Sequence, residues 1–523
     1  MRTVDGTTLA ALQEYLAGRL AKHATEPLNR QIYLQIRDAI LHGPLSSGMA
    51  LPSSRALAES LGLGRNTVLH AYGQLEAEGY IASRAGAGTF VADLDNAPPV
   101  GHQPAQTPHK AFQALSKRGE TVLYNLPPTY EDASNAHLRT GLPDLSAFPW
   151  KQWQRILHKH QRACKPSDLG YMGRGGHPAL KASIARYLSL SRGVNCTPDQ
   201  ILITHGMQQA LLTIALTLAD SGDQVWLEEP GYMGVRLAFL AAGLDVHPVP
   251  VDADGMQWSD ALPSPRLIYV TPSHQYPTGA VMSLARRQAL LAEATRRGAW
   301  IIEDDYDSEF RHSGRPIAAL QGLDKTGRVI YLGTFSKMLF PALQLGYLVV
   351  PPDLAHSMRR LQARLMREGS YLEQAALADF IDEGHFGAHL RHMRVTYARR
   401  QGKLRQTLVR ELGEHFTEQP AHFDTHISLL GGAAGMHVLM RLPKHVDDSV
   451  ISGALHAAGV HIAALSRYCL STPPFPGLIL GYANEDDATL TLAVVKLARL
   501  LKELVWPNSV ADARRVASPT TAP

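Results

Sequence analysis

Apolar residues recur at two different spacings, and the spacing changes along the chain. Between residues 28 and 91, the helical pattern LNRQIYLQIRDAILHG precedes two short helical segments and a hairpin-like end. From about residue 200, strand-like runs such as QILIT, QVWLEE, AWIIEDD and VIYLGTF alternate with helical runs such as QQALLTIALTLAD. Alternation of this kind predicts an α/β fold with a mostly parallel sheet covered by helices.

The pattern divides the chain into two modules, a linker and a tail. Residues 26–93 form the first module and residues 135–505 the second. In the second module, the text after about Pro352, including MHVLMRLP and LILGYA, predicts a smaller α+β lobe. Residues 94–134 begin with Pro-rich polar text that predicts an extended linker. Residues 506–523 are predicted to be a disordered tail.

Composition excludes several classes of protein. An apolar content of 45% and a charged content of 19% are ordinary for a globular protein. The cysteines at 164, 196 and 469 form no CxxC pair, so we expect reduced thiols and no metal site. No signal-peptide pattern opens the chain and no run of about 18 apolar residues occurs in it, which predicts a cytoplasmic protein without a membrane span. A net charge of +4 is nearly neutral and does not decide whether nucleic acid is a partner.

The segment LPSSRALAESLGLGRNTVLHAYGQLEAEGYIASRAGAGTFV predicts two helices and a β-hairpin. Ser54 can cap the first helix and Gly62 can end it. Val68 begins an apolar row at i, i+4 and i+7 that would face the first helix. This is the order of a winged helix-turn-helix, in which the start of the second helix meets DNA and the hairpin forms the wing. The residues that we expect to contact a double-stranded DNA operator are Arg55, Arg65, Asn66, Thr67, Arg84 and Gly88.

A small helical module that binds proteins is the alternative for this segment. Acidic residues slightly outnumber basic ones within residues 1–100, so attraction to phosphates must come from the local placement of arginines. The text closely resembles the GntR family of winged-helix regulators, in which LPSSR, LG..RNTV..AY..L..EGY and R.G.GTFV are typical. The resemblance covers the whole module and implies a DNA-binding transcription regulator.

In the second module, four predicted strands each end in residues suited to a cofactor. In chain order these are Gly206 and Met207, then Tyr232, then Asp304 and Tyr306, then Thr334 and Lys337. A lysine amine forms a Schiff base with an aldehyde, and an aspartate keeps a pyridine nitrogen protonated. A helix start binds phosphate, and an aromatic ring stacks on a pyridine. Singly, such residues are more often surface, capping, packing or turn residues. Together, at one edge of a sheet, they indicate a site for a phosphorylated pyridine aldehyde.

Residues 141–501 resemble the fold-type I aminotransferases, which bind pyridoxal 5'-phosphate. The resemblance implies that Lys337 carries the cofactor, Asp304 pairs with the pyridine nitrogen and Tyr306 contacts the ring oxygen. It further implies that Tyr232 stacks on the ring and that Gly206, Met207 and Thr334 hold the phosphate. Tyr171 matches a tyrosine that these enzymes lend to the phosphate of the neighbouring subunit, so a homodimer is expected.

The two resemblances together are those of the MocR-type regulators, for which the string TPSHQYPTG at 271–279 is characteristic. Three positions depart from the enzymes. Tyr276 replaces an asparagine that touches the ring oxygen, and we count it among the cofactor-contacting residues. Gln344 replaces an arginine that binds phosphate or a ligand acid. Ile479 replaces the arginine that anchors a substrate carboxylate, and Arg467, nearby in sequence, could compensate.

These departures favour a sensor over an enzyme. The leading hypothesis is a regulator whose aminotransferase-like domain senses pyridoxal 5'-phosphate, or a small amine or amino acid, and thereby alters DNA binding. A catalytically active aminotransferase with an appended DNA-binding domain is the alternative. A dimerisation scaffold without cofactor is a third hypothesis, raised by Gln344.

Overall fold

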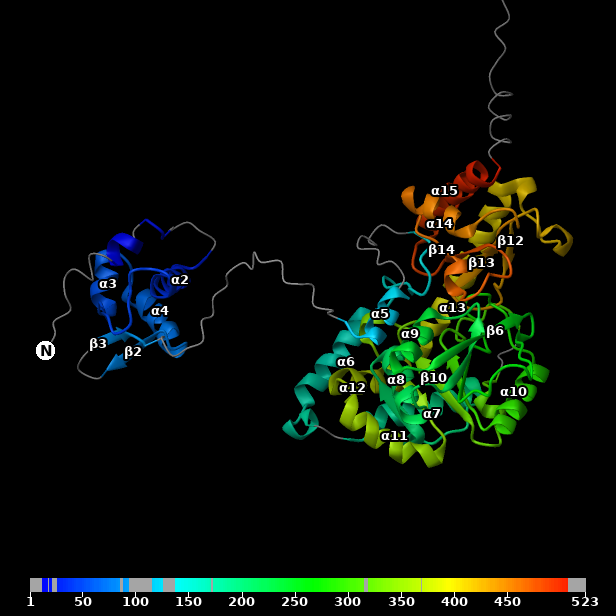
Figure 1. Cartoon of the computed structure of the whole chain (residues 1–523), viewed down its shortest axis with the longest axis horizontal. Coiled ribbons are helices and arrows are strands. Elements are labelled where there is room, and N and C mark those ends of the chain that lie inside the picture. The colour runs from blue at the N-terminus through cyan, green and yellow to red at the C-terminus, as the bar shows by residue number, and fades with distance from the viewer. Residues whose placement is uncertain are drawn as a thin grey trace, which may run out of the picture. The chain divides into compact units, whose positions relative to one another are not determined.

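The computed structural model describes residues 12–16, 18–20, 26–84, 88–93, 115–125, 137–170, 173–314, 318–367 and 369–506 (Figure 1). It divides into two compact units, Met1–Phe112 and Gln113–Pro523. Among the helices in these ranges, none is both long enough and apolar enough to cross a bilayer.

The first unit has a helical core with a small antiparallel sheet. Its elements are α2 (Leu28–Leu41), β1 (Ala50–Leu51), α3 (Ser54–Leu61), α4 (Arg65–Ala77), β2 (Ile81–Arg84) and β3 (Gly88–Val91). The strands lie in the order β1-β3-β2. Val68, Tyr72 and Leu75 of α4 are buried against the other helices, as their spacing predicts.

The predicted cap of α3 is wrong by one residue. Ser53 is the N-cap, and its hydroxyl accepts a hydrogen bond from the Ala56 N–H at 3.2 Å, whereas Ser54 is the first helical residue. Two adjacent serines offer the same chemistry, so the sequence does not decide between them. Gly62 ends α3 in the left-handed conformation with φ 64°, as predicted.

The second unit is built on an eight-stranded sheet in the order β4-β11-β10-β9-β8-β5-β6-β7. The strands are β4 (Ile201–Thr204), β5 (Gln224–Glu229), β6 (Asp245–Asp252), β7 (Gly255–Met256), β8 (Leu267–Val270), β9 (Trp300–Asp305), β10 (Val329–Thr334) and β11 (Gly346–Val349). Strands β10, β9, β8, β5 and β6 are mutually parallel, and β11 runs antiparallel to both of its neighbours. The sheet is therefore mostly parallel, as the sequence predicts.

Helices cover both faces of this sheet. Successive side chains of β10 alternate, with Ile330 and Leu332 packed in the cluster of α8 and α9 and Tyr331 packed in the cluster of α7, α12 and α13. Besides a short helix at Lys117–Tyr124, the α-helices of the unit are α6 (Trp150–Ala163), α7 (Pro178–Arg192), α8 (Gly206–Leu218), α9 (Met233–Ala242), α10 (Leu284–Arg297), α11 (Pro352–Leu365), α12 (Tyr371–Asp382), α13 (His385–Leu412), α14 (Asp448–Ala457) and α15 (Asp487–Val505).

The predicted smaller lobe is an antiparallel sheet in the order β12-β13-β15-β14, packed with α14 and α15. Its strands are β12 (Ser428–Leu430), β13 (His437–Arg441), β14 (Ala463–Ala464) and β15 (Gly477–Gly481). The long helix α13 packs against α15 and leads into this lobe (Figure 1). The start of β13 and the ends of the large-sheet strands contribute to one site.

Helix α5 (Lys117–Tyr124) lies within the segment 94–134 that we assign to the linker. It is capped by Ser116, whose hydroxyl accepts from Gly119 N–H at 3.1 Å, and it contacts α9 of the large unit. Part of the proposed linker therefore packs against the second unit. The remainder of that segment, and residues 507–523 of the proposed tail, lie outside the described residues.

Candidate cofactor site and DNA-binding surface

A cavity of about 350 Å³ lies at the carboxyl ends of β8, β9 and β10, where the small lobe meets the large sheet. It is lined by Thr140, Gly141, Met207, Tyr232, Tyr269, Thr271, Tyr276, Asp304, Tyr306, Asp307, Thr334, Ser336, Lys337, Met436 and His437. Seven of the residues predicted to bind a cofactor are in this wall, namely Met207, Tyr232, Tyr276, Asp304, Tyr306, Thr334 and Lys337. Gly206 is the first residue of α8, beside Met207, and does not itself line the cavity. Tyr171 lies outside the described residues.

Asp304, at the end of β9, has one satisfied and one unsatisfied carboxylate oxygen. The hydroxyl of Tyr269 on β8 donates to Oδ2, whereas Oδ1 is buried and has no hydrogen-bond partner among the described residues. Burial raises the pKa of Asp304 to about 8, although the hydrogen bond from Tyr269 acts in the opposite direction. A cationic N–H donor within the cavity would pair with Oδ1 and restore the ionised form. The protonated nitrogen of a pyridine ring is such a donor.

Lys337 follows β10 and places its amine in the same cavity. Its Nζ donates to the carbonyl oxygen of Gly141 at 2.6 Å. Burial lowers the pKa of Lys337 from its ordinary value, against the attraction of Asp307 and Asp304. An amine with a lowered pKa is more often unprotonated and can attack an aldehyde carbon. The residue types and their surroundings thus fit pyridoxal 5'-phosphate.

Three tyrosines surround the space between these two groups. The ring of Tyr276 lies edge-on to those of Tyr232 and Tyr306, with centroids 6.0 Å apart in both pairs. The hydroxyl of Tyr276 donates to that of Tyr468, at 3.2 Å, in the small lobe. Aromatic faces and edges of this kind suit a flat ring. Helix α8 starts at Gly206, and its N-cap residue His205 makes no side-chain cap hydrogen bond, so the first helical N–H groups suit a phosphate.

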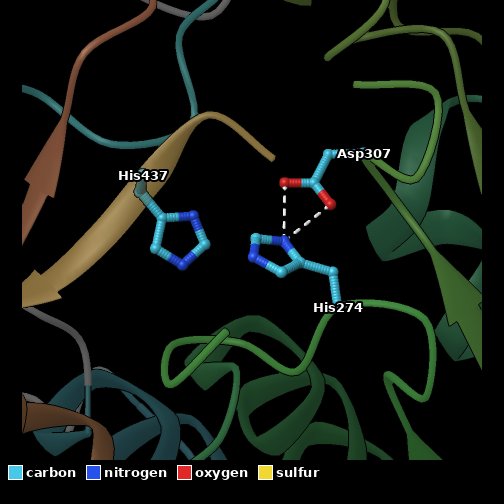
Figure 2. A group of neighbouring side chains, drawn as sticks. All are labelled: His274, Asp307 and His437. Carbon is cyan, nitrogen blue, oxygen red and sulfur yellow. Dashed lines mark hydrogen bonds and ion pairs between the residues drawn. The ribbon is translucent and has the colours of Figure 1, made fainter. Parts of the chain in front are cut away.

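His274, Asp307 and His437 form a buried group beside the cavity (Figure 2). Nδ1 of His274 lies 3.0 and 3.1 Å from the two Asp307 carboxylate oxygens. Nε2 of His437 donates to the Pro277 carbonyl at 3.3 Å. Side chains of these types can also ligate a cation, and their ligand atoms lie within 4.8 Å of one another. In this arrangement, however, hydrogen bonds already occupy one nitrogen of each histidine.

The residues predicted to contact DNA lie mostly at the surface of the first unit. Arg55, Arg65, Asn66, Arg84 and Gly88 are exposed, and Thr67 is half-buried. Helix α4 begins after Gly64 without a side-chain cap, so its first N–H groups are available to an acceptor such as a phosphate. The guanidinium of Arg84 lies 5.2 Å from the centre of the Phe90 ring, across the β2–β3 hairpin.

Comparison with known families assigns both units. Residues 28–91 match the model "Bacterial regulatory proteins, gntR family", and residues 141–495 match "Aminotransferase class I and II". The chain is 42% identical to the probable rhizopine catabolism regulatory protein MocR of Rhizobium meliloti, over 96% of this chain and 99% of that protein. The chain belongs to the MocR-type transcriptional regulators.

Further relatives of this MocR-type regulator carry other names. It is 30% identical to the HTH-type pyridoxine biosynthesis transcriptional regulator PdxR of Corynebacterium glutamicum, over 92% of this chain and 97% of that protein. Its fold matches a solved α-aminoadipate aminotransferase of Thermus thermophilus, complexed with N-(5'-phosphopyridoxyl)-L-leucine, with a TM-score of 0.62 and 26% identity. That match covers 75% of this chain and 95% of the enzyme. A kynurenine aminotransferase of Pyrococcus horikoshii shares the fold with a TM-score of 0.63 at 24% identity, over 77% of this chain and 99% of the enzyme.

The MocR-type chain departs from the enzymes at positions that the structure now places. Ile479, on β15, is fully buried in an apolar cluster with Leu439 and Leu465. A charged side chain at position 479 would therefore enter an apolar environment. Gln344 is exposed, has a left-handed φ of 48° and lies outside the cavity wall. Arg467 lies in the turn Leu465–Tyr468 and also lies outside that wall.

Sequence reasoning missed several residues of the MocR-type cavity. Tyr269 lies in the short, fully buried strand β8, and nothing in the sequence of that strand distinguishes it as the partner of Asp304. His274 lies within the string TPSHQYPTG and Asp307 directly follows Tyr306, so their position in the sequence was a usable signal. His437 and Met436 begin a strand of the small lobe, and only the packing of the two lobes brings them to the site.

Proposed function

We propose that this regulator binds pyridoxal 5'-phosphate through Lys337 and that the loaded domain senses its effector and changes how the winged helix-turn-helix binds an operator. The observation that carries the proposal is the orphaned Oδ1 of Asp304, buried in the same cavity as the Lys337 amine. An unpartnered buried carboxylate oxygen is costly, and a pyridine N–H offsets that cost. A partly buried lysine in the same wall, Lys337, would supply the covalent attachment.

The other wall residues complete the proposed cofactor site. Tyr232 would stack on the ring, Tyr306 would contact its ring oxygen, and Met207 and Thr334 with the start of α8 would hold the phosphate. When bound, the cofactor supplies an aldehyde carbon that reacts reversibly with amines. Two copies of the chain would form a homodimer, in which Tyr171 reaches the phosphate of the neighbouring site. DNA recognition is assigned to Arg55, Arg65, Asn66, Thr67, Arg84 and Gly88.

Two effector classes are compatible with this site. Pyridoxal 5'-phosphate itself needs no carboxylate clamp, and a small amine needs none either. For an ordinary amino acid, this site lacks the arginine that would hold the substrate carboxylate, since Ile479 stands at that position. Ile479 is fully buried among apolar side chains. The same feature disfavours the alternative function, a working aminotransferase, although the Lys337 and Asp304 pair would support a first half-reaction.

The experiment uses the full chain and a double-stranded fragment selected by that chain from a random library. The purified protein, reconstituted with pyridoxal 5'-phosphate, should show visible absorption that Lys337→Ala abolishes and the exposed control Lys151→Ala retains. Affinity for the selected fragment should change on loading in the Lys151→Ala protein and not in Lys337→Ala. A colourless wild-type protein whose DNA affinity ignores the cofactor would overturn the proposal. Steady release of a keto acid from an amino-acid panel would favour the enzyme instead.

A further inference from the structure

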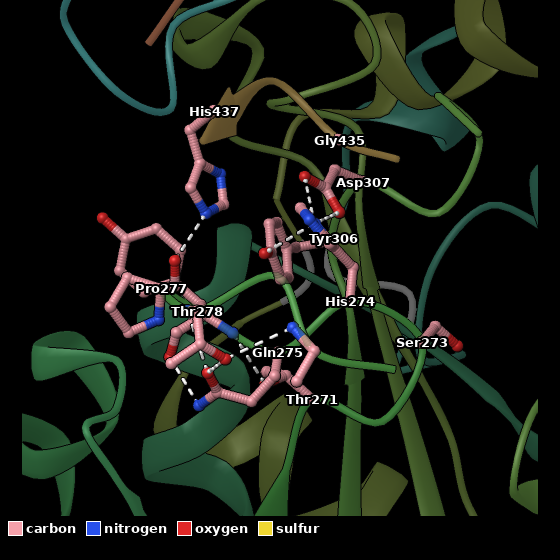
Figure 3. Close-up of polar contacts among 12 residues, drawn as sticks. Thr271, Ser273, His274, Gln275, Pro277, Thr278, Tyr306, Asp307, Gly435 and His437 are labelled. Atoms are coloured by element: carbon pink, nitrogen blue, oxygen red, sulfur yellow. Dashed lines mark hydrogen bonds and ion pairs between the residues drawn. The ribbon is translucent and has the colours of Figure 1, made fainter. Parts of the chain in front are cut away.

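Tyr306 and Asp307, directly after β9, both contact Nδ1 of His274, which lies in the loop after β8 (Figure 3). The Tyr306 hydroxyl lies 3.1 Å from Nδ1 of His274, and that nitrogen lies 3.0 and 3.1 Å from the Asp307 oxygens. The side chains of His274 and Asp307 are 2% and 1% exposed. Tyr306 and Asp307 both line the cavity, so this group reaches from the protein interior to the ligand space.

Proton positions follow from these contacts. An ionised carboxylate only accepts hydrogen bonds, so Nδ1 of His274 must carry the proton that faces Asp307. A protonated Nδ1 has no lone pair, so it cannot accept a hydrogen bond from Tyr306. The Tyr306 oxygen can only accept from Nδ1–H, and the Tyr306 proton must point elsewhere. Among the described residues, His274 is the one partner of the Tyr306 hydroxyl, which leaves the cavity as the direction for that proton.

The backbone at Gly435, just before β13 of the small lobe, packs against His274 and Asp307. At Gly435, where φ is +85°, an added Cβ would lie 2.2 Å from Cε1 of His274 and 2.6 Å from an Asp307 oxygen. On the other side of the imidazole, an added Cβ at Gly279 would lie 3.4 Å from Nε2. Glycine at both positions lets the chain pack directly on the ring. The packing keeps the His274–Asp307 contact almost entirely away from bulk solvent.

We infer that His274 and Asp307 are a positioning pair that makes the Tyr306 hydroxyl a hydrogen-bond donor to the ring oxygen of the cofactor. The inference rests on the proposed binding of pyridoxal 5'-phosphate. Several charged or titratable groups lie near Tyr306 among the described residues. They are Asp307 and Asp304 from β9 and its end, Glu228 of β5, Lys337 after β10, His274 and Tyr276 from the loop after β8, and His437 at the start of β13. Burial and His274 keep the pKa of His437 at about 3, so His437 is neutral and does not compete for the Asp307 carboxylate as a cation.

A donor at the ring oxygen changes the acidity of the Lys337–cofactor linkage. When the linkage nitrogen loses its proton, the negative charge on the ring oxygen is no longer neutralised by a neighbouring N–H. Donation by Tyr306 stabilises that form more than the protonated form and therefore lowers the pKa of the linkage nitrogen. Without His274, the Asp307 carboxylate would lose its hydrogen-bond donor and could accept the Tyr306 proton, so that donation to the cofactor would weaken.

The test is a pH titration of the visible absorption of the full-length protein loaded with pyridoxal 5'-phosphate. His274→Leu should raise the pKa of the linkage by about one pH unit, as expected for loss of a charge-assisted hydrogen bond. His274→Asn keeps an N–H near the position of Nδ1 and should titrate close to wild type. Asp307→Asn retains the side-chain volume but no longer holds the proton on Nδ1 of His274. It should raise the pKa of the linkage as His274→Leu does, by a smaller amount.

A double variant separates positioning from a merely structural role. If His274 acts through Tyr306, the double variant His274→Leu/Tyr306→Phe should raise the pKa of the linkage no further than Tyr306→Phe alone does. Additive shifts, or superimposable titrations of wild type and His274→Leu, would show that the inference is wrong. A shift of the wild-type curve on addition of EDTA would also overturn it, because a bound cation would then hold these side chains. A wild-type protein without visible absorption would instead refute the proposed function itself.

Discussion

Arg192 of α7 and Asp305 of β9 form a buried ion pair, with Nε of Arg192 2.7 Å from Oδ2 of Asp305 and side-chain exposures of 5% and 1%. The guanidinium also donates to the Ser273 hydroxyl at 2.7 Å, and Tyr331 donates to the same Asp305 oxygen at 2.6 Å. Asp305 directly follows Asp304 in the strand, so neighbouring carboxylates point to opposite faces of the sheet. The pair therefore fixes the strand end that carries Asp304.

Removal of one member of this pair should be more damaging than removal of both. Arg192→Met leaves a buried carboxylate unpaired and should lower the unfolding free energy of the large unit by about 3–5 kcal/mol. The double variant Arg192→Met/Asp305→Leu should recover most of that loss. All six tryptophans lie beyond residue 149, so tryptophan fluorescence in a urea titration follows this unit selectively. A loss below about 1 kcal/mol in the single variant would contradict the expectation.

Asp304→Asn should affect the cofactor-free and loaded proteins in opposite ways. Burial raises the folded-state pKa of Asp304 to about 8, whereas an unfolded aspartate has a pKa of about 3.9. Between these values the folded state holds a proton that the unfolded state releases, so this group costs stability as pH rises. The cofactor-free Asp304→Asn protein should match wild type near pH 4 and exceed its stability by at least about 1 kcal/mol above pH 8.

The same Asp304→Asn substitution should weaken cofactor binding about ten- to hundredfold, because it removes a charge-assisted hydrogen bond to the ring nitrogen. Thermal unfolding across this pH range measures the first effect, and equilibrium binding of pyridoxal 5'-phosphate measures the second. A variant that gains no stability at high pH would show that the Asp304 carboxyl is not held in a desolvated state.

Gly141→Ala should interfere with Lys337. A Cβ at position 141 would lie 2.7 Å from Nζ, and φ at this glycine is +74°, which L-residues rarely adopt. We expect slower formation of the visible absorption and a stability loss of about 1 kcal/mol or more. Gly402→Ala is the control, since Gly402 lies within α13 and no atom of the described part of the chain lies within 4 Å of the added Cβ. Equal rates of cofactor incorporation in both variants would contradict this role of Gly141.

Arg65→Gln should weaken binding to the selected DNA fragment about tenfold and reduce the slope of log affinity against log salt by about one. Arg30→Gln removes the same charge from the exposed surface of α2, where Arg30 pairs with Glu26 at 2.9 Å, and should leave the slope unchanged. Fluorescence anisotropy at several salt concentrations provides both values. Similar losses in the two variants would mean that net charge, rather than the start of α4, determines affinity.

Local patterns predicted much of the fold. Asp304 and Lys337 were predicted to share one edge of the sheet because both follow apolar strands, and both line the cavity at the carboxyl ends of β9 and β10. Helix α5 escaped prediction because its short amphipathic pattern follows Pro-rich text and its stability depends on contact with α9. His437 could not be assigned, since its place depends on how a strand of the small lobe packs against a loop 160 residues earlier in the chain, at Pro277.

The cavity wall combines residues from both lobes, with Asp304 and Lys337 on the large sheet and Met436 and His437 on the small one. A molecule bound between them would contact both lobes, so that its binding and the packing of the two lobes would stabilise each other. Loosening of the small lobe, whether by heat, by truncation of β15 or by a packing defect near Leu439, should therefore release the vitamin-derived group before the large sheet itself melts.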